Sequence, residues 1–381
     1  MKHIYSFLII LLFVGTVKAQ TTVNGSFVHD GITRTYSFYV PALYTPGHPV
    51  PMVIGLHGTG SSGAQFAQYR NFSPVADTAN FIMVHPDGTT LFGQKFWNFG
   101  NVLGSTVDDV GFIEALIDTI SSHYSIDQNR IYSAGMSNGG FMTYYLACQT
   151  DRFAAIGSVT GSMSNSMYTN CNPQRPTPSI HVHGTSDPTN PYAGNSSSKS
   201  IPVVTRFWVD QNDCDTIPVI TQVPNINTTD GATAERHLYS NGINGNTVEH
   251  FKVTGGEHTW PGGPMPGSTD VTCMDFNACV ELWRFFRQYK LNSATGIKNT
   301  MNDIEVNIWP NPSTGYVNIK TGDCIVTNVI ITDLQGRVVR NYTNGNIQYV
   351  DLSYIKQGIY TAKISGKDFS VVKKLVIESV D

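Results

Sequence analysis

The chain has 381 residues, which predicts either one large domain with a smaller one or a single oversized domain. Apolar residues make up 40%, and charged residues make up only 14%, against roughly 25% in an ordinary soluble protein. With 24 Lys and Arg against 28 Asp and Glu, the formal net charge is −4, which excludes a basic nucleic-acid-binding protein and an acidic disordered chain.

The first element in chain order is a predicted signal peptide over residues 1–19. The stretch from Ile4 to Val14 is mostly apolar, and Ala19 completes a small-residue cleavage site before Gln20. A membrane anchor is the alternative, but this run is far shorter than the roughly 20 residues that a spanning helix needs. We therefore expect an exported protein with no membrane span, in a compartment where disulfides persist.

Apolar runs then alternate with stretches of helical spacing over residues 20–290. The predicted strands are Arg34–Val40, Met52–Leu56, Phe81–Val84, Arg130–Ala134, Ala154–Val159 and Ser179–Val182. The predicted helices are Val110–His123, Ser137–Cys148 and Met274–Tyr289. This alternation predicts an α/β domain whose mostly parallel sheet is covered on both faces, with the active site beyond the carboxyl ends of the strands.

The pattern changes after a small, polar stretch over 291–302, which we interpret as a linker. Short alternating runs separated by turn signals predict a small all-β sandwich over 303–381. The expected strands are Glu305–Trp309, Tyr316–Ile319, Asn328–Thr332, Arg337–Tyr342, Tyr349–Leu352, Gly358–Ile364 and Ser370–Ile377.

The nucleophile candidate is Ser137, in the sequence Gly-Met-Ser-Asn-Gly over 135–139. It follows a β-branched strand and precedes a predicted helix, which is the context of a nucleophile elbow. The alternative is an ordinary glycine turn without a catalytic role. In such an elbow the serine is exposed at the top of the sheet, and small residues on both sides permit the sharp turn.

A serine hydroxyl needs a base, and in this fold the acid and then the histidine follow the nucleophile along the chain. Asp187 follows the strand Ser179–Val182, although an Asp beside a proline is often only a turn former. His258 lies in a glycine-rich loop before the terminal helix, whereas His237 and His250 sit inside strand-like segments. We therefore expect Asp187 to orient His258 as the base for Ser137.

The oxyanion hole is expected to use two backbone N–H groups. One belongs to Asn138, directly after the nucleophile, and the other to Thr59 in the loop after Met52–Leu56. His57 in the same loop is an alternative base, but its position fits a loop-ordering role better.

Together these motifs resemble the polyhydroxybutyrate depolymerase and feruloyl esterase group of the α/β-hydrolases. The resemblance rests on LHGTGSSG at 56–63, HPDGT at 85–89, VDDVGFIEALID at 107–118, RIYSAGMSNGGFMTYYLAC at 130–148, HVHGTSDPTNPY at 181–192 and GGEHTWPGG at 255–263. It implies an α/β-hydrolase fold, a secreted serine esterase without cofactor or metal, and the roles of Asp187 and His258. Glu257, where the family often has glycine, is a departure that adds a carboxylate near His258.

The C-terminal segment resembles the sorting domain of type IX secretion substrates in Bacteroidetes. The resemblance rests on the order WPNPSTGYVNI, ITDLQGRVV, VDLSYIKQGIYTAKI and KKLVIE between Ile304 and Ile377. It implies a secreted or cell-surface protein that engages a secretion machinery. A carbohydrate-binding module is the alternative, but the aromatic residues of this segment form no obvious cluster.

Three aromatic residues, Trp97, Trp260 and Tyr192, are candidates to line an apolar substrate cleft, although they could equally be packing residues. Among the cysteines, Cys148 ends the helix after the nucleophile and Cys171 precedes the strand before Asp187, so we expect these two to form a disulfide.

The sequence thus predicts a secreted serine esterase acting on polyhydroxyalkanoate or on feruloyl or acetyl esters of polysaccharides, which are polymeric or plant-cell-wall substrates. Two alternatives stay open. One is a serine peptidase of the same fold, and the other is a surface binding protein with an inactive hydrolase core. No nucleic-acid partner is expected.

Overall fold

The computed structural model divides into two compact units, residues 1–293 and 294–381. The predicted signal peptide and residues 292–302 of the predicted linker lie outside the described part of the chain. The structure describes residues 20–263, 267–291, 306–321, 324–333, 337–343, 345–366 and 370–378.

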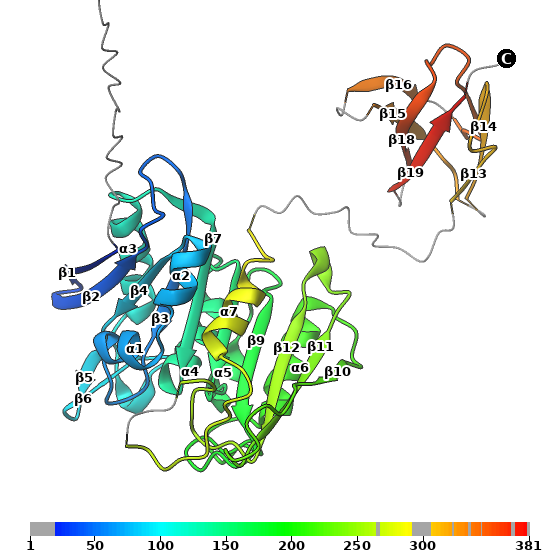
Figure 1. The fold of residues 1–381 in the computed structure, drawn as a ribbon. Coiled ribbons are helices and arrows are strands. Elements are labelled where there is room, and N and C mark those ends of the chain that lie inside the picture. The colour runs from blue at the N-terminus through cyan, green and yellow to red at the C-terminus, as the bar shows by residue number, and fades with distance from the viewer. Residues whose placement is uncertain are drawn as a thin grey trace, which may run out of the picture. The chain divides into compact units, whose positions relative to one another are not determined.

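The first unit is built on a ten-stranded sheet in the order β1-β2-β4-β3-β7-β8-β9-β12-β11-β10 (Figure 1). Its central neighbours, from β4 to β12, are parallel, whereas the strands toward either edge pair antiparallel. The strands are β1 Thr21–His29, β2 Ile32–Val40, β3 Val50–Leu56, β4 Ile82–Pro86, β7 Ile126–Met136, β8 Ala155–Val159, β9 Ser179–Gly184, β10 Val219–Gln222, β11 Thr233–Tyr239 and β12 Val248–Thr254.

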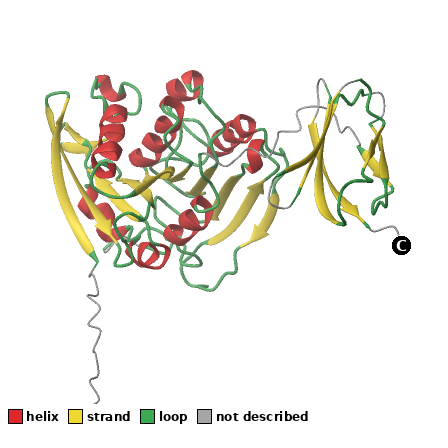
Figure 2. Cartoon of the chain, turned by 90° about the horizontal axis from the view of Figure 1, so that it is seen from above, coloured by secondary structure: helices red, strands yellow, loops and turns green. Residues whose placement is uncertain are grey.

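Helices cover both faces of this sheet (Figure 2). They are α1 Gly63–Tyr69, α2 Ser73–Ala79, α3 Asp109–Ser121, α4 Asn138–Gln149, α5 Asn165–Asn170, α6 Ile201–Asn212 and α7 Ala278–Phe286. A small hairpin, β5 Thr89–Leu91 and β6 Gln94–Phe96, and two 3-10 turns, Val102–Gly104 and Ile243–Gly245, complete the unit. The predicted α/β-hydrolase architecture is confirmed.

Each face of the sheet has its own hydrophobic core, because side chains along a strand alternate between the faces. In β7, Ile131 joins the core formed with α3, α4 and α6, while the adjacent Tyr132 joins the core formed with α1, α2 and α7. The nearly continuous apolar run of β3 is fully buried, as expected for a strand covered on both sides.

The structure differs from the sequence-based elements at several boundaries and in several additions; β7, for example, begins at Ile126 rather than Arg130. The predicted terminal helix begins at Ala278 rather than Met274, because the Asn277 side chain caps it by accepting from the N–H groups of Cys279 and Val280. The elements β1, α1 and α2 fall in stretches for which no element is predicted; β1 has no buried residue, so its sequence carries little apolar alternation.

The second unit has a three-stranded and a four-stranded sheet, both antiparallel. Apolar residues of the two sheets share one core, which confirms the predicted all-β domain. Each predicted strand is present, as β13 Asn307–Trp309, β14 Tyr316–Lys320, β15 Asn328–Thr332, β16 Val338–Thr343, β17 Tyr349–Asp351, β18 Gly358–Ser365 and β19 Ser370–Ile377.

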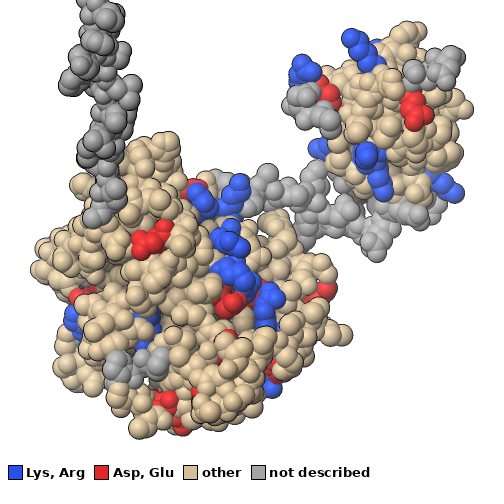
Figure 3. Space-filling model, in the orientation of Figure 1, with Lys and Arg blue, Asp and Glu red and all other residues tan. Residues whose placement is uncertain are grey.

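The surface carries few charges, as the composition predicts. On the face drawn in Figure 3, most of the first unit is neither acidic nor basic, and many of its visible Lys and Arg side chains lie in one band, with a few others apart from it. Among the described residues, none of the helices combines the length and the apolar character needed to span a bilayer.

Candidate active site

Ser137 occupies the sharp turn between β7 and α4. Its backbone has φ 55° and ψ −120°, a conformation that is strained for a residue with a side chain and recurs at functional sites. The turn is held at both ends, since the Ser137 N–H donates to Val159 O and its carbonyl accepts from Phe141 N–H. The strand–turn–helix context predicted for the nucleophile is therefore present.

The glycines on either side of Ser137 are required by close backbone packing. A Cβ on Gly135 would lie 2.1 Å from the carbonyl oxygen of Gly139, and a Cβ on Gly139 would lie 2.1 Å from that of Leu56. Neither clash can be relieved by rotating a side chain, because both contacts are with backbone atoms. The glycines of the motif thus let α4 approach β3 and β7 closely.

His258 and Asp187 come together from two loops that follow neighbouring strands, β12 and β9. The Nδ1 atom of His258 lies 2.8 Å from Oδ2 of Asp187. The Asp187 side chain is fully buried, while that of His258 is 17% exposed and lines the same pocket as Ser137. Glu257 points elsewhere and accepts a hydrogen bond from Val271 N–H.

Asp187 is held ionised by several donors. Burial raises the pKa of its carboxyl group, but hydrogen bonds from His183 and His258 and the backbone N–H of Asn190 outweigh this effect and bring the pKa well below its usual range. Oδ1 also accepts from the N–H of Thr189. The carboxylate therefore stays negative and fixed in orientation at neutral pH.

A chain of buried side chains leads to Asp187 from the core between the sheet and α4. The Tyr144 hydroxyl lies 2.7 Å from His181 Nδ1, and His181 Nε2 lies 3.0 Å from His183 Nδ1. His183 Nε2 faces two acceptors, Asn190 O at 2.8 Å and Asp187 Oδ2 at 3.3 Å, so it must carry a proton. His183 thus donates toward Asp187 through Nε2, and its ring is held in place by His181, which Tyr144 contacts in turn.

His57 is buried and does not face the pocket. Its Nδ1 lies 2.8 Å from Gly58 O, and its Nε2 accepts from Gly88 N–H. Burial lowers the pKa of His57 to about 4, so the ring is neutral at physiological pH. These contacts agree with a loop-ordering role.

The loop after β3 runs beside Ser137. A Cβ on Gly58 would lie 3.3 Å from the Cβ of Ser137, and Thr59 lines the pocket. Asn138, the first residue of α4, is buried, and its amide exchanges two hydrogen bonds with the backbone of Trp97. The described residues provide no hydrogen-bond acceptor for the backbone N–H of Thr59 or of Asn138.

The pocket has a volume of about 240 Å³. Trp260, a predicted substrate-binding residue, contributes to its wall but is only 1% exposed, packed edge-on against Phe66. The pocket is lined by Gly58, Thr59, Ser61, Gln65, Phe66, Tyr69, Arg70, Met136, Ser137, His258, Thr259, Trp260, Ser268 and Asp270.

The other two aromatic candidates do not line this pocket. Trp97 is completely buried, and its indole N–H donates to the carbonyl of His57, so it braces the loop rather than facing a substrate. The Tyr192 hydroxyl lies 2.9 Å from His250 Nε2. These contacts hold both side chains outside the described pocket, and their role as substrate-binding residues stays a prediction.

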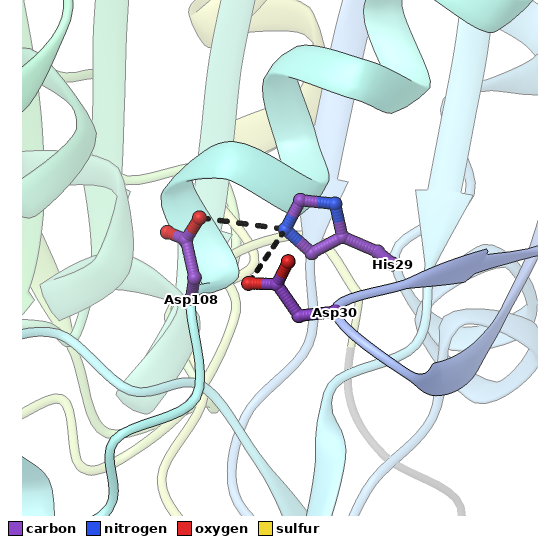
Figure 4. Close-up of side chains that lie close together, drawn as sticks. All are labelled: His29, Asp30 and Asp108. Atoms are coloured by element: carbon purple, nitrogen blue, oxygen red, sulfur yellow. Dashed lines mark hydrogen bonds and ion pairs between the residues drawn. The ribbon is translucent and has the colours of Figure 1, made fainter.

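Among the described residues, two groups of side chains have the composition of metal ligands. In the first, His29 Nε2 lies 3.4 Å from Asp108 Oδ2 and 3.8 Å from Asp30 Oδ2 (Figure 4). The second consists of Asp230, Cys273 and Asp275. Neither lines the pocket, and Asp108 is explained as the N-cap of α3. Neither group therefore carries a metal assignment.

The expected disulfide is present between Cys148 and Cys171, which confirms that prediction. It ties the end of α4 to the end of α5. Three of the remaining cysteines, Cys214, Cys273 and Cys279, are free and buried.

Two family models match parts of the chain. Residues 307–378 match the secretion system C-terminal sorting domain, and residues 58–207 match the prolyl oligopeptidase family. The second match spans the Ser137 turn and Asp187, and ends before His258.

Curated relatives include a bifunctional acetylxylan esterase/xylanase of Neocallimastix patriciarum, which is 25% identical over 77% of this chain and 39% of the relative. Feruloyl esterase B of Piromyces equi is 28% identical over 59% of this chain and 42% of the relative. A poly(3-hydroxybutyrate) depolymerase of Ralstonia pickettii is 32% identical over 39% of this chain and 33% of the relative. The chain thus spans less than half the length of each of these relatives.

Among solved structures, acetyl xylan esterase from Aspergillus awamori aligns at 15% identity with a TM-score of 0.47, covering 67% of this chain and 94% of that one. The sheet order, the turn at Ser137 and the sequence relatives agree with one another. The hydrolase unit is similar to α/β-hydrolase esterases, among them feruloyl esterases and a polyhydroxybutyrate depolymerase, and the match of residues 307–378 to the secretion system C-terminal sorting domain indicates a secreted or cell-surface protein.

Proposed function

We propose that this protein is a secreted serine esterase in which Ser137 is the nucleophile, His258 the general base and Asp187 the residue that orients the base. The observation that carries the proposal is the 2.8 Å contact between His258 Nδ1 and Asp187 Oδ2, with the imidazole lining the same pocket as Ser137. That contact leaves Nε2 as the ring nitrogen available to the serine hydroxyl.

In the first half of the reaction, Ser137 Oγ attacks the ester carbonyl carbon while His258 Nε2 takes its proton. The negative oxygen that forms is stabilised by the backbone N–H groups of Thr59 and Asn138, each worth about 3–4 kcal/mol in comparable enzymes. When the intermediate collapses, His258 returns the proton to the leaving alkoxide, which departs as an alcohol and leaves the acyl group on Ser137.

In the second half, water attacks the acyl group and gives its proton to His258. Collapse of the second intermediate releases the carboxylic acid and restores the Ser137 hydroxyl with that proton. Asp187 stabilises the imidazolium in both halves without taking a proton itself. Its depressed pKa and its buried, multiply bonded position support this role.

As substrates we propose polymeric esters, either polyhydroxyalkanoate or feruloyl and acetyl esters of polysaccharides. The relatives named as feruloyl esterase, acetylxylan esterase/xylanase and poly(3-hydroxybutyrate) depolymerase support this range. The secretion system sorting domain supports action outside the cell and engagement of a secretion machinery.

The test is hydrolysis of 4-nitrophenyl acetate by the wild-type protein and by Ser137→Ala. We expect the variant to lose kcat by about 10⁴-fold or more, and to lose labelling by a fluorophosphonate probe. Full activity in Ser137→Ala would refute the proposal. Release of acid from feruloylated arabinoxylan, acetylated xylan and polyhydroxybutyrate film then ranks the substrates.

A serine peptidase is the second candidate, because residues 58–207 match the prolyl oligopeptidase family. The same residues would cleave an amide by the same steps. Hydrolysis of a peptidyl 4-nitroanilide at a higher kcat/KM than the matched ester would favour this candidate. Failure of Ser137 to react with the fluorophosphonate probe would instead favour a binding protein with an inactive core.

A further inference from the structure

The pocket beside Ser137 contains a buried positive charge. Arg70, the residue that caps the end of α1, is 6% exposed and lines this pocket together with Ser137 and His258. Burying a guanidinium lowers the stability of the fold unless a carboxylate or several good acceptors surround it. Its surroundings therefore indicate what the pocket is built to hold.

The partners of Arg70 are weak. Its Nε and Nη2 atoms lie 3.2 and 3.1 Å from the Sδ atom of Met136, a thioether that accepts hydrogen bonds poorly. Its Nη1 atom donates at 3.2 Å to the carbonyl of Tyr69 and at 3.4 Å to that of Gly263. Burial lowers the pKa of Arg70, but arginine stays protonated in proteins.

No carboxylate balances this charge in the described part of the chain. The other charged residue that lines the pocket, Asp270, is exposed, and no ion pair joins it to Arg70. Apart from Met136, the side chains that interact with the guanidinium include Trp260, whose ring centroid is 5.9 Å from the guanidinium carbon, and the buried thiol of Cys279. The positive charge thus faces sulfur, aromatic rings and backbone carbonyls.

The two N–H groups that meet the Met136 sulfur form the side of the guanidinium that matches a carboxylate. A carboxylate can accept from Nε and Nη2 in parallel, which gives the strong bidentate arrangement. Methionine is flexible and can move aside without disturbing the strand that carries it. An anionic group in the pocket would therefore exchange a weak acceptor for two charge-assisted hydrogen bonds.

We propose that Arg70 binds an ionised carboxyl group of the substrate, so that the enzyme favours esters whose acyl chain ends in a free carboxylate. This inference rests on the proposed esterase function, because it places the carboxylate a short chain away from the carbonyl that Ser137 attacks. A pocket of about 240 Å³ suits a chain of a few carbons, as in the half esters of short dicarboxylic acids.

The test compares monomethyl with dimethyl succinate, glutarate and adipate, with acid release followed at constant pH near 7.5. For at least one chain length, we expect the wild-type kcat/KM for the half ester to exceed that for the diester by ten- to hundredfold. Arg70→Gln should abolish this preference, chiefly through a higher KM for the half ester. Arg70→Lys keeps the positive charge but not the two parallel N–H donors, so it should retain only part of the half-ester preference.

Arg206→Gln serves as the matched control, because Arg206 is exposed and pairs with Asp210 away from the pocket. Its half-ester preference should equal that of the wild type. An equal preference in wild type and Arg70→Gln would overturn the proposal. Because Arg70→Gln could impair folding, the thermal unfolding midpoint is measured for each variant, and Arg70→Lys provides the comparison if the glutamine variant unfolds.

A binding measurement separates this proposal from the proposed function. Calorimetric titration with adipate measures binding at the Arg70 site without any turnover, and neutral 1,6-hexanediol is the control ligand. Adipate should bind the wild type at least tenfold more tightly than Arg70→Lys, and equal binding would overturn the Arg70 assignment. Failure of the esterase proposal alone would appear as diester hydrolysis that survives in Ser137→Ala.

Discussion

The Nε2 atom of His183 lies 3.3 Å from Oδ2 of Asp187, the same oxygen that faces Nδ1 of His258 at 2.8 Å. One carboxylate oxygen thus contacts two imidazoles, that of the fully buried His183 and that of His258 at the pocket. Since the buried imidazole is itself fixed by His181, the position of the carboxylate is determined from the core side of the sheet.

This relationship predicts that His183 is a positioning residue. His183→Phe keeps an aromatic ring of similar shape but removes the donor to Asp187, so we expect kcat on 4-nitrophenyl acetate to fall about tenfold with little change in KM. The variant should also lose about 1–3 kcal/mol of unfolding free energy, because the acceptors of His183 lose a buried donor.

Tyr144→Phe is the matched control for this experiment. It removes one hydroxyl at the far end of the same chain, 2.7 Å from His181 Nδ1, and should lower stability by about 1 kcal/mol while changing kcat less than His183→Phe does. If the two variants lose stability and kcat in the same proportion, the effect of His183 is only structural.

The proposed oxyanion hole predicts a different signature at Thr59. Thr59→Pro removes the backbone N–H, and we expect kcat to fall by about 10²–10³-fold, because a developing negative charge loses one donor. Thr59→Ala keeps that N–H and should stay within a few-fold of the wild type. Equal losses in the two variants would show that the side chain or the loop shape, rather than the N–H, is responsible.

Local patterns were sufficient to predict much of the fold. Strands such as β14 and β18 were predicted from alternation and turn residues within a few positions, and Ser137 from glycines that immediately flank it. The edge strand β1 lacks a buried side, so the apolar pattern that would reveal it is missing.

Contacts between distant parts of the chain explain what sequence reasoning missed. Trp97 was predicted to line the cleft on its aromatic character alone, but its place is decided by a hydrogen bond to His57, 40 residues away. Arg70 meets Met136 across 66 residues, and no local pattern signals that contact. By contrast, the sequence His-Val-His-Gly-Thr-Ser-Asp places His181 and His183 on one strand face leading to Asp187, a signal that could have been used.

The disulfide predicts a measurable loss of stability on reduction. Cys148 and Cys171 close a loop with a sequence separation of 23, for which the loss of chain entropy in the unfolded state is worth about 3 kcal/mol. The double variant Cys148→Ser, Cys171→Ser should show this loss in urea unfolding of the hydrolase unit. Cys324→Ser, in the other unit, should leave that transition unchanged, and equal transitions in all three proteins would contradict the prediction.

Buried histidines predict that the hydrolase unit loses stability in mild acid. Burial lowers the pKa of His57 and of His85 to about 4 and that of His250 to about 3, against an ordinary value of 6.5. The unfolded chain therefore binds more protons than the folded one once the pH falls below about 6.5, so stability decreases from there down to the folded pKa values. Burial also lowers the pKa of His181, so four such groups give a slope of up to about 5 kcal/mol per pH unit.

The Asp187 carboxylate affects stability in a lower pH range than these histidines do. Its folded pKa is depressed, so its contribution is fully present above the unfolded value of about 4 and is lost only below it. Urea midpoints at pH 7.5, 6.5, 5.5 and 4.5 therefore isolate the histidines. His85→Leu should reduce the dependence of stability on pH by about one quarter without a large loss of stability, because His85 Nε2 has no hydrogen-bond partner among the described residues. His48→Gln is the control, because His48 is exposed, and it should leave the dependence of stability on pH unchanged. If the stability of the wild type does not change between pH 6.5 and 4.5, these rings are not buried as neutral groups.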